Sequence, residues 1–285
     1  MQKTTPLMGI LLSLSLCHFC NDALQAVVNS LYPIIKNDLA LNFMQIGIIT
    51  LCYQLSASVL QPLMGIYLDR KPNPWFITLA AVSTFSGLIC LSFANTFITI
   101  IASVILVGMG SSIVHPEASR LTSLASGGRK GLAQSLFQVG GNLGSSVGPL
   151  LAAFIIAPYG RQNTMFVALL AFVGVGASII IARWYKKILD EKAATFANQN
   201  GKKRVVHPGD ADWIERPYSN KRTYFYIGVL LVLIFSKYVY MASINSYYTF
   251  YTMEKFGLDV QQSQYALFVF VFSTALGTLM GGPIG

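Results

Sequence analysis

Charged residues are scarce in this sequence. They make up 11% of the 285 residues, whereas hydrophobic residues make up 54%. A soluble domain carries about 25% charged residues, so a water-soluble globular fold is excluded. The 20 basic residues outnumber the 11 acidic ones, but most of them lie in short segments between apolar runs, a pattern of membrane topology and not of nucleic-acid binding. The sequence therefore predicts a protein that lies in a lipid bilayer and binds no nucleic acid.

Cysteine is also rare, and the usual patterns of metal and catalytic sites are missing. The four cysteines lie within apolar runs, and no second ligand pair accompanies the C-x-x-C formed by Cys17 and Cys20. Neither an H-E-x-x-H motif nor a nucleophile–base pair is present. We therefore expect buried thiols, no catalytic residues, no metal, no enzymatic activity and no cofactor.

Long apolar runs are abundant. Eight of them approach the roughly 20 residues that a helix needs to cross the hydrocarbon core, and the alternating runs of barrel strands are lacking. Because a spanning helix satisfies its own backbone hydrogen bonds, we predict an all-α integral membrane protein. The expected spans are 7–33, 43–68, 75–95, 97–118, 132–158, 164–184, 224–248 and 263–285.

The positions of lysine and arginine predict the orientation. If the N-terminus is cytoplasmic, sixteen basic residues fall in the inside segments and three in the outside loops. Inside loops are enriched in lysine and arginine. We therefore predict a multi-pass membrane protein with a cytoplasmic N-terminus.

One long polar connection divides the spans into six and two. The predicted organisation is an N-terminal six-helix half (1–184), a cytoplasmic linker (185–222) and the first two helices of a second half (223–285). The segment YQLSASVLQPLMG at 53–65 aligns without a gap with FVFSTALGTLMGG at 270–282, which pairs the second span with the eighth, as two related halves require. The second copy stops before the acid that follows the first, so we expect a chain truncated at its C-terminus.

Two loop and helix motifs resemble those of the major facilitator superfamily. The segment GIYLDRKPNPW carries Gly65, Asp69 and Arg70 of the loop signature, while Pro72 and Asn73 replace its usual ending. The segment GNLGSSVGPLLAA resembles the antiporter signature. It contributes the helix-packing residues Gly144, Gly148 and Pro149. The resemblance implies a gating role for the charged loop.

Three longer segments, SSIVHPEASR, SGGRKGLAQSLFQVGGN and IFSKYVYMASINSYYTFY, resemble the fosmidomycin-resistance branch of this superfamily. The resemblance implies a twelve-span fold of the cytoplasmic (inner) membrane, of which eight spans are present, and a carrier that exports a small drug in exchange for protons. The partners would be a small-molecule substrate, protons and the lipid bilayer. Two alternatives stay open: an uptake carrier for an organic phosphate or another small anion, and an inactive fragment without transport.

Asp22 and Lys237 lie about halfway through the first and seventh spans. An ionisable group at this depth is costly unless it faces a cavity or a partner, by about 2.5–3.5 kcal/mol on insertion scales. In the superfamily fold these two spans face each other across the central cavity. The two residues are therefore interpreted either as a structural ion pair or as a site in which Lys237 binds an anionic cargo and Asp22 modulates it.

The segment SSIVHPEASR places His115, Glu117 and Arg120 near the inner end of the fourth span. Partial burial favours a protonated Glu117, whereas Arg120, three residues on, favours the charged form. Glu117 is thus a proton-coupling group with His115 as relay, an anchor paired with its fourth-helix charge partner Arg120, or a direct contact of the cargo. The residues predicted to couple protons are Glu117, His115 and Asp22. Polar side chains of the fifth and seventh spans complete the expected substrate cavity: Gln138, Asn142, Tyr240 and Asn245.

Overall fold

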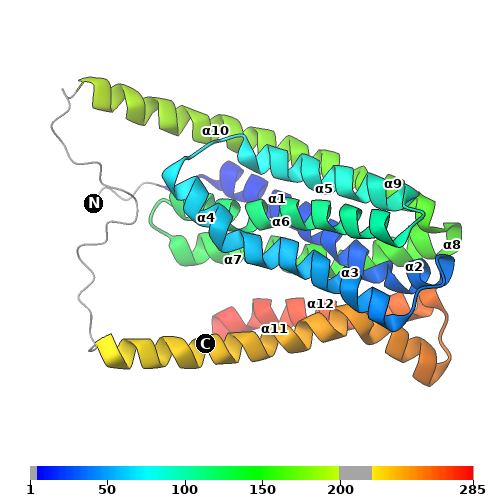
Figure 1. Cartoon of the computed structure of the whole chain (residues 1–285). Coiled ribbons are helices and arrows are strands. Elements are labelled where there is room, and N and C mark those ends of the chain that lie inside the picture. Colours follow the sequence, from blue (N-terminus) through cyan, green and yellow to red (C-terminus); the bar gives the residue numbers. More distant parts are fainter. Residues whose placement is uncertain (1–4, 199–219, 285) are drawn as a thin grey trace. The chain divides into compact units, whose positions relative to one another are not determined.

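The computed structural model describes residues 5–198 and 220–284, and every regular element in these ranges is a helix (Figure 1). The α-helices, and the short π- and 3-10 segments marked η, are α1 (Met8–Ser30), α2 (Tyr32–Asp38), α3 (Phe43–Gln54), η1 (Leu55–Val59), α4 (Leu60–Arg70), α5 (Phe76–Phe93), α6 (Phe97–Ala125), α7 (Lys130–Leu151), η2 (Ala152–Ile156), α8 (Ala157–Tyr159), η3 (Arg161–Asn163), α9 (Thr164–Ala168), α10 (Leu170–Asn198), α11 (Asn220–Phe256) and α12 (Val260–Ile284).

Seven helical stretches of the described chain are long and apolar enough to cross a membrane by length and composition. They are Met8–Ser30, Phe43–Arg70, Phe76–Phe93, Phe97–Ala125, Lys130–Tyr159, Arg161–Glu191 and Arg222–Phe256. Helix α12, with 25 residues, is a further apolar helix. The predicted all-α membrane fold is confirmed. Helix α6 continues through Pro116, and α7 continues through Pro149.

The chain divides into two compact units. The first comprises Met1–Lys186 and Asn245–Gly285, and the second comprises Lys187–Ile244. The predicted division into 1–184, 185–222 and 223–285 stays a prediction, since residues 199–219 of the expected linker lie outside the described residues. The site described below lies within the first unit.

Local sequence signals explain where two of the helices begin. The Asn42 side chain accepts the Gln45 backbone N–H, and the Gln45 side chain accepts the Asn42 N–H. Thr96 and Thr99 form the same reciprocal capping box at the start of α6. Each box satisfies two backbone donors that the first helical turn leaves without partners. These caps set the starting points of α3 and α6.

Glycines spaced four apart bring α1 and α7 into close contact. A Cβ on Gly140, Gly144 or Gly148 would overlap atoms of α1, namely the backbone of Ser15, the backbone of Phe19, and Ala26. Small residues at this spacing let two helix backbones approach each other in a membrane protein. Gly144 and Gly148 of the antiporter-like segment therefore lie in the α1–α7 interface.

Helix α12 and the end of α11 belong to the first unit and contact it where α1 ends at Ser30. The Gln264 side chain donates to the Ser30 carbonyl at 2.8 Å, and Gln261 donates to the Ala153 carbonyl at 3.1 Å. The ring of Phe250, on α11, lies 5.3 Å from that of Phe43. Helix α12 also packs along α7, and both helices border the same cavity.

Candidate functional site

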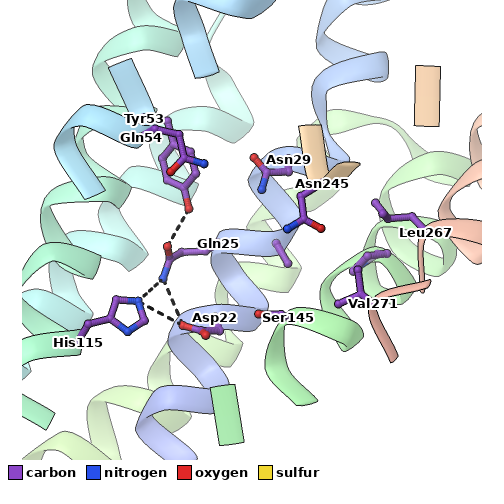
Figure 2. A pocket seen from close by; sticks show the side chains of 12 residues that line it. Asp22, Gln25, Asn29, Tyr53, Gln54, His115, Ser145, Asn245, Leu267 and Val271 are labelled. Atoms are coloured by element: carbon purple, nitrogen blue, oxygen red, sulfur yellow. Dashed lines mark hydrogen bonds and ion pairs between the residues drawn. The ribbon is translucent and has the colours of Figure 1, made fainter. Parts of the chain in front are cut away.

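A cavity of about 170 Å³ lies among α1, α3, α6, α7, α11 and α12 (Figure 2). Most of its lining side chains are polar, which is unusual for a space between apolar helices. The lining residues are Asp22, Gln25, Ala26, Asn29, Tyr53, Gln54, His115, Ser145, Pro149, Asn245, Leu267 and Val271. A mostly polar cavity inside such a bundle is a candidate site for binding cargo or moving ions.

The spacing along α1 explains how one helix contributes so many polar groups. Asp22, Gln25 and Asn29 follow one another at intervals of three and four residues, so they lie on one face of the helix. His18 lies one turn before Asp22. In Figure 2 the side chains of Asp22 and Gln25 point toward His115. Helix α1 therefore supplies the acidic side of the cavity.

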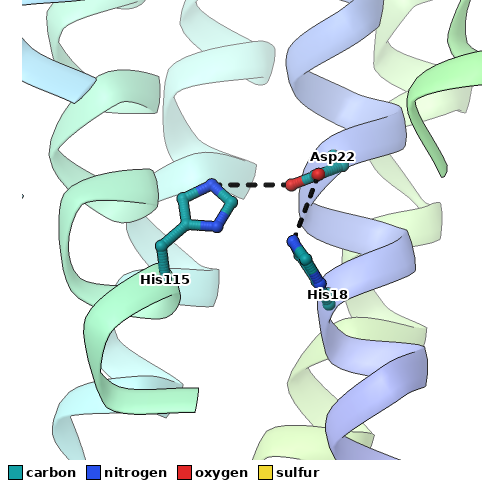
Figure 3. A group of neighbouring side chains, drawn as sticks. All are labelled: His18, Asp22 and His115. Carbon is teal, nitrogen blue, oxygen red and sulfur yellow. Dashed lines mark ion pairs between the residues drawn. The ribbon is translucent and has the colours of Figure 1, made fainter. Parts of the chain in front are cut away.

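Two histidines converge on the carboxylate of Asp22 (Figure 3). The distance from His18 Nε2 to Asp22 Oδ2 is 3.2 Å, and that from His115 Nε2 to Asp22 Oδ1 is 3.6 Å. The side chains of His18, Asp22 and His115 are 5%, 16% and 27% exposed. One carboxylate is thus shared by two imidazoles from α1 and α6, and the side that faces the cavity is accessible.

The arrangement around His18 suits a shared proton. His18 Nδ1 lies 2.8 Å from the carbonyl oxygen of Phe137. A carbonyl only accepts, so the hydrogen of this contact lies on Nδ1. A hydrogen bond across the 3.2 Å contact from His18 Nε2 to Asp22 needs one further hydrogen, carried either by Nε2, which makes the ring an imidazolium, or by the carboxyl group. The geometry therefore suits one proton shared between His18 and Asp22.

The same donor set raises the question of a metal ion. The ligand atoms of His18, Asp22 and His115 all lie within 4.8 Å of one another, and imidazole and carboxylate are ligands that Zn²⁺ accepts. A structural zinc site takes four protein ligands and an open zinc site takes three, and this group offers three among the described residues. The 3.2 Å contact from His18 Nε2 to Asp22 Oδ2 is also a hydrogen-bond distance, so the same geometry suits a proton.

A chain of hydrogen bonds links this cluster to a tyrosine on the opposite wall of the cavity. The Tyr53 hydroxyl donates to Gln25 Oε1 at 2.8 Å. Gln25 Nε2 lies 3.4 Å from Asp22 Oδ1 and 3.5 Å from His115 Nε2. Asn21 donates to the same Asp22 oxygen at 3.1 Å. Asp22 Oδ1 therefore accepts hydrogen bonds from two amide donors.

Helix α7 packs directly against His18 and Asp22. The Phe137 ring stacks on the His18 ring, with centroids 4.0 Å apart. A Cβ on Gly141 would collide with the His18 ring and with the Asp22 carboxylate. A residue without a side chain is therefore needed at 141 for this arrangement.

Glu117, two residues after His115, belongs to a different cluster. Its carboxylate is 2% exposed and accepts hydrogen bonds from Arg120, at 3.0 Å from Nε and 2.7 Å from a terminal nitrogen. The same terminal nitrogen donates to the Tyr185 hydroxyl at 3.0 Å. This two-point pairing is the strongest geometry that a carboxylate and a guanidinium adopt. Glu117 is thereby joined to α10 through Arg120.

A second cavity, of about 330 Å³, lies beside the Glu117 cluster. Gly65, Asp69, Pro116 and Ser119 are among its lining residues. Asp69 and Arg70 are exposed, and neither forms an ion pair with another described residue. Their gating role stays a prediction.

The other predicted cavity residues lie in several places. Asn245 lines the 170 Å³ cavity, whereas Gln138 is exposed and Asn142 is half-buried, and neither is a lining residue. Lys237 and Tyr240 are exposed residues of the second compact unit, so the pairing of Lys237 with Asp22 stays a prediction. Pro149 lines the cavity.

Sequence reasoning missed three members of the network: His18, Gln25 and Tyr53. The spacing of His18, Asp22 and Gln25 in the segment HFCNDALQ was a usable signal, because residues three or four apart share a helix face. Tyr53 carried no such signal, since its contact with Gln25 crosses from α3 to α1.

A family model described as Major Facilitator Superfamily matches residues 14–285. The chain belongs to the major facilitator superfamily. It is therefore a multi-pass membrane protein of a family of small-molecule transporters, not of enzymes.

Two curated relatives match nearly the whole chain. The fosmidomycin resistance protein of Escherichia coli K12 is 47% identical over 97% of the chain, and the uncharacterized MFS-type transporter YfnC of Bacillus subtilis 168 is 36% identical over 98%. The chain spans 65% and 66% of the lengths of these relatives. The predicted resemblance to the fosmidomycin-resistance branch is confirmed.

A solved structure shows the same fold at low sequence identity. The crystal structure of tetrameric PepTSo2 aligns with 97% of this chain and 54% of its own, with a TM-score of 0.53 and 15% identity. At this identity the likeness concerns the fold alone.

Proposed function

We propose that the protein to which this chain belongs exports a small drug-like compound in exchange for protons. The observation that carries this proposal is the close approach of the His18 imidazole to the Asp22 carboxylate beside a polar cavity, a geometry that suits a shared proton. An exchanger needs a group that binds a proton where the cargo also binds, so that the occupancy of one site affects the other. Asp22 lines the cavity and meets this requirement.

Among the residues predicted to couple protons, the proposal places the exchange on Asp22, with His18 and His115 as its partners. Asp22 and His115 are accessible from the cavity. Glu117 is held on two sides by Arg120 and is almost fully buried. Its proposed role is therefore the other one considered from the sequence, an anchor at the end of the fourth span.

The proposed cargo is fosmidomycin or a compound like it. The support is the similarity to the E. coli fosmidomycin resistance protein. The cavity lining offers amide and hydroxyl groups from Gln25, Asn29, Tyr53, Gln54 and Asn245, which suit a polar compound. Lys237 and Tyr240 are proposed as further cargo contacts. The proposed location is the cytoplasmic membrane, with the N-terminus inside, as the distribution of basic residues favours.

The test compares two proteins in drug-sensitive cells that lack their own exporter. One is this chain, and the other is a hybrid in which the chain is continued by the part of the E. coli relative outside the match. Growth and intracellular fosmidomycin are measured with and without a proton uncoupler. We expect the hybrid to lower intracellular drug and the uncoupler to abolish this effect.

Each other outcome has a definite meaning. A hybrid that reaches the membrane but leaves intracellular drug unchanged contradicts fosmidomycin export, and increased accumulation favours an uptake carrier. Export that survives the uncoupler contradicts proton exchange. The chain without the added part reports whether its eight apolar helices suffice for transport.

A further inference from the structure

The hydrogen bonds around Gln25 fix the direction in which each donor points. The carboxylate of a charged Asp22 only accepts hydrogen bonds, so the nitrogen of the Gln25 amide must face it. The amide oxygen then faces Tyr53, and the Tyr53 hydroxyl must donate to it. One charged carboxylate thus determines the orientation of two side chains further along the wall of the cavity (Figure 2).

This orientation decides what Tyr53 offers to a molecule in the cavity. A phenol has one hydrogen to donate, and that hydrogen is used for Gln25. The Tyr53 oxygen can then only accept a further hydrogen bond from the cavity. When Asp22 carries the proton, its oxygens need fewer donors, the Gln25 amide is free to turn, and the Tyr53 hydrogen can point into the cavity instead.

We propose that Gln25 and Tyr53 transmit the proton occupancy of Asp22 to the cargo, and that they recognise a hydrogen-bond donor of the cargo, a hydroxyl or N–H group, when Asp22 is charged. This inference rests on the proposed function, because it assumes that Asp22 exchanges the proton. Gln25 and Tyr53 are positioning residues for that exchange. They connect the two binding events and do not themselves take up the proton.

Linkage gives this arrangement a measurable consequence. If the cargo binds the charged form of Asp22 better, then the proton weakens cargo binding and the cargo releases the proton by the same factor. Other titratable groups near Asp22 are His18 and Cys17 on α1, His115 on α6 and Tyr53 on α3. The part of α7 that touches the cluster consists of Phe137 and Gly141. Because these groups can also titrate, the Asp22→Asn variant serves as the reference that separates their pH dependence from that of Asp22.

The experiment measures fosmidomycin affinity at several pH values and the proton release on drug addition, using the purified hybrid in detergent. The variants are Gln25→Leu and Tyr53→Phe. The matched control is Gln54→Leu, because Gln54 lines the same cavity but has no described contact with Asp22. In the unmodified protein we expect drug affinity to fall about tenfold per pH unit on acidification, the limit for one proton competing with one drug.

Gln25→Leu and Tyr53→Phe are expected to flatten this dependence and to lower the number of protons released per drug. Gln54→Leu is expected to lower affinity by the same factor at every pH. If both test variants retain the full dependence, the proposed link is overturned. Melting temperatures identify a variant that has not folded, and Tyr53→Phe, which removes one oxygen atom, then carries the test.

The Asp22→Asn arm separates this inference from the proposed function. Asp22→Asn should abolish proton release by itself. If Asp22→Asn loses proton release while Gln25→Leu and Tyr53→Phe behave like the unmodified protein, proton exchange at Asp22 is supported and the proposed link through Gln25 is contradicted. If Asp22→Asn releases protons normally, the exchange site itself is wrong.

Discussion

Asp22 and Glu117 are both carboxylates inside predicted membrane spans, but their surroundings differ. Asp22 shares its oxygens among two histidines and two amides and lines a cavity. Glu117 has both oxygens bound by one guanidinium, which a tyrosine holds in turn. A permanent cation stabilises a carboxylate in one charge state, whereas imidazoles can give up or take a proton. From this difference in partners we expect proton exchange at Asp22 and not at Glu117.

The largest effect is expected from Asp22→Asn. Asparagine keeps the size of the side chain and removes the proton-binding oxygen, so proton release on fosmidomycin addition should disappear. A pH-sensitive dye with the purified hybrid measures the release, and proton-driven transport into vesicles checks it. Release at the unmodified level would show that the two carboxylates do not differ in the way proposed.

Gly141→Ala should have the next largest effect, because the new methyl group overlaps His18 and Asp22. Overpacking of this kind costs about 1–3 kcal/mol. We expect a lower melting temperature together with reduced proton release. Gly131→Ala is the matched control on the same helix, since a Cβ there meets nothing within 4 Å. Equal behaviour of the two variants would contradict the tight fit of the cluster against α7.

His115→Gln should have a smaller effect. His115 is more exposed than His18 and lies 3.6 Å from the carboxylate, beyond a hydrogen-bond distance. We expect proton release to persist with a changed pH dependence, whereas His18→Gln should reduce it strongly. Titration of drug-induced proton release for both variants ranks the two histidines. The reverse ranking would place the proton between Asp22 and His115.

Glu117→Gln should leave proton release unchanged and lower stability instead. The neutral amide loses the two-point pairing and leaves Arg120 partly unpaired, which costs about 1–3 kcal/mol. Melting temperature in detergent measures this loss. Its control is Glu191→Gln, which removes an exposed carboxylate 3.9 Å from Lys187, where surface pairs contribute about 0–1 kcal/mol. Loss of proton release in Glu117→Gln would show that proton exchange depends on Glu117.

The helical membrane fold could be predicted from the sequence, because apolar runs of spanning length have one stable solution in lipid. The pairing of Glu117 with Arg120 could also be predicted, as one of three alternatives, since the two residues lie three apart on one helix. The spacing of Gly144 and Gly148 predicted close helix packing, but not that α1 is the partner. These are local patterns, because residues three or four positions apart are adjacent on the surface of one helix.

The sequence by itself determined the element type, the depth of Asp22 in its span and the helix face that it shares with His18 and Gln25. Only the tertiary structure decided that His115, from a helix about ninety positions later, and Tyr53 meet that face, and that Gln138 does not line the cavity. The physical reason is that helix periodicity fixes angles within one helix, whereas the rotation of one helix against another is set by packing at contacts such as Gly141 on His18.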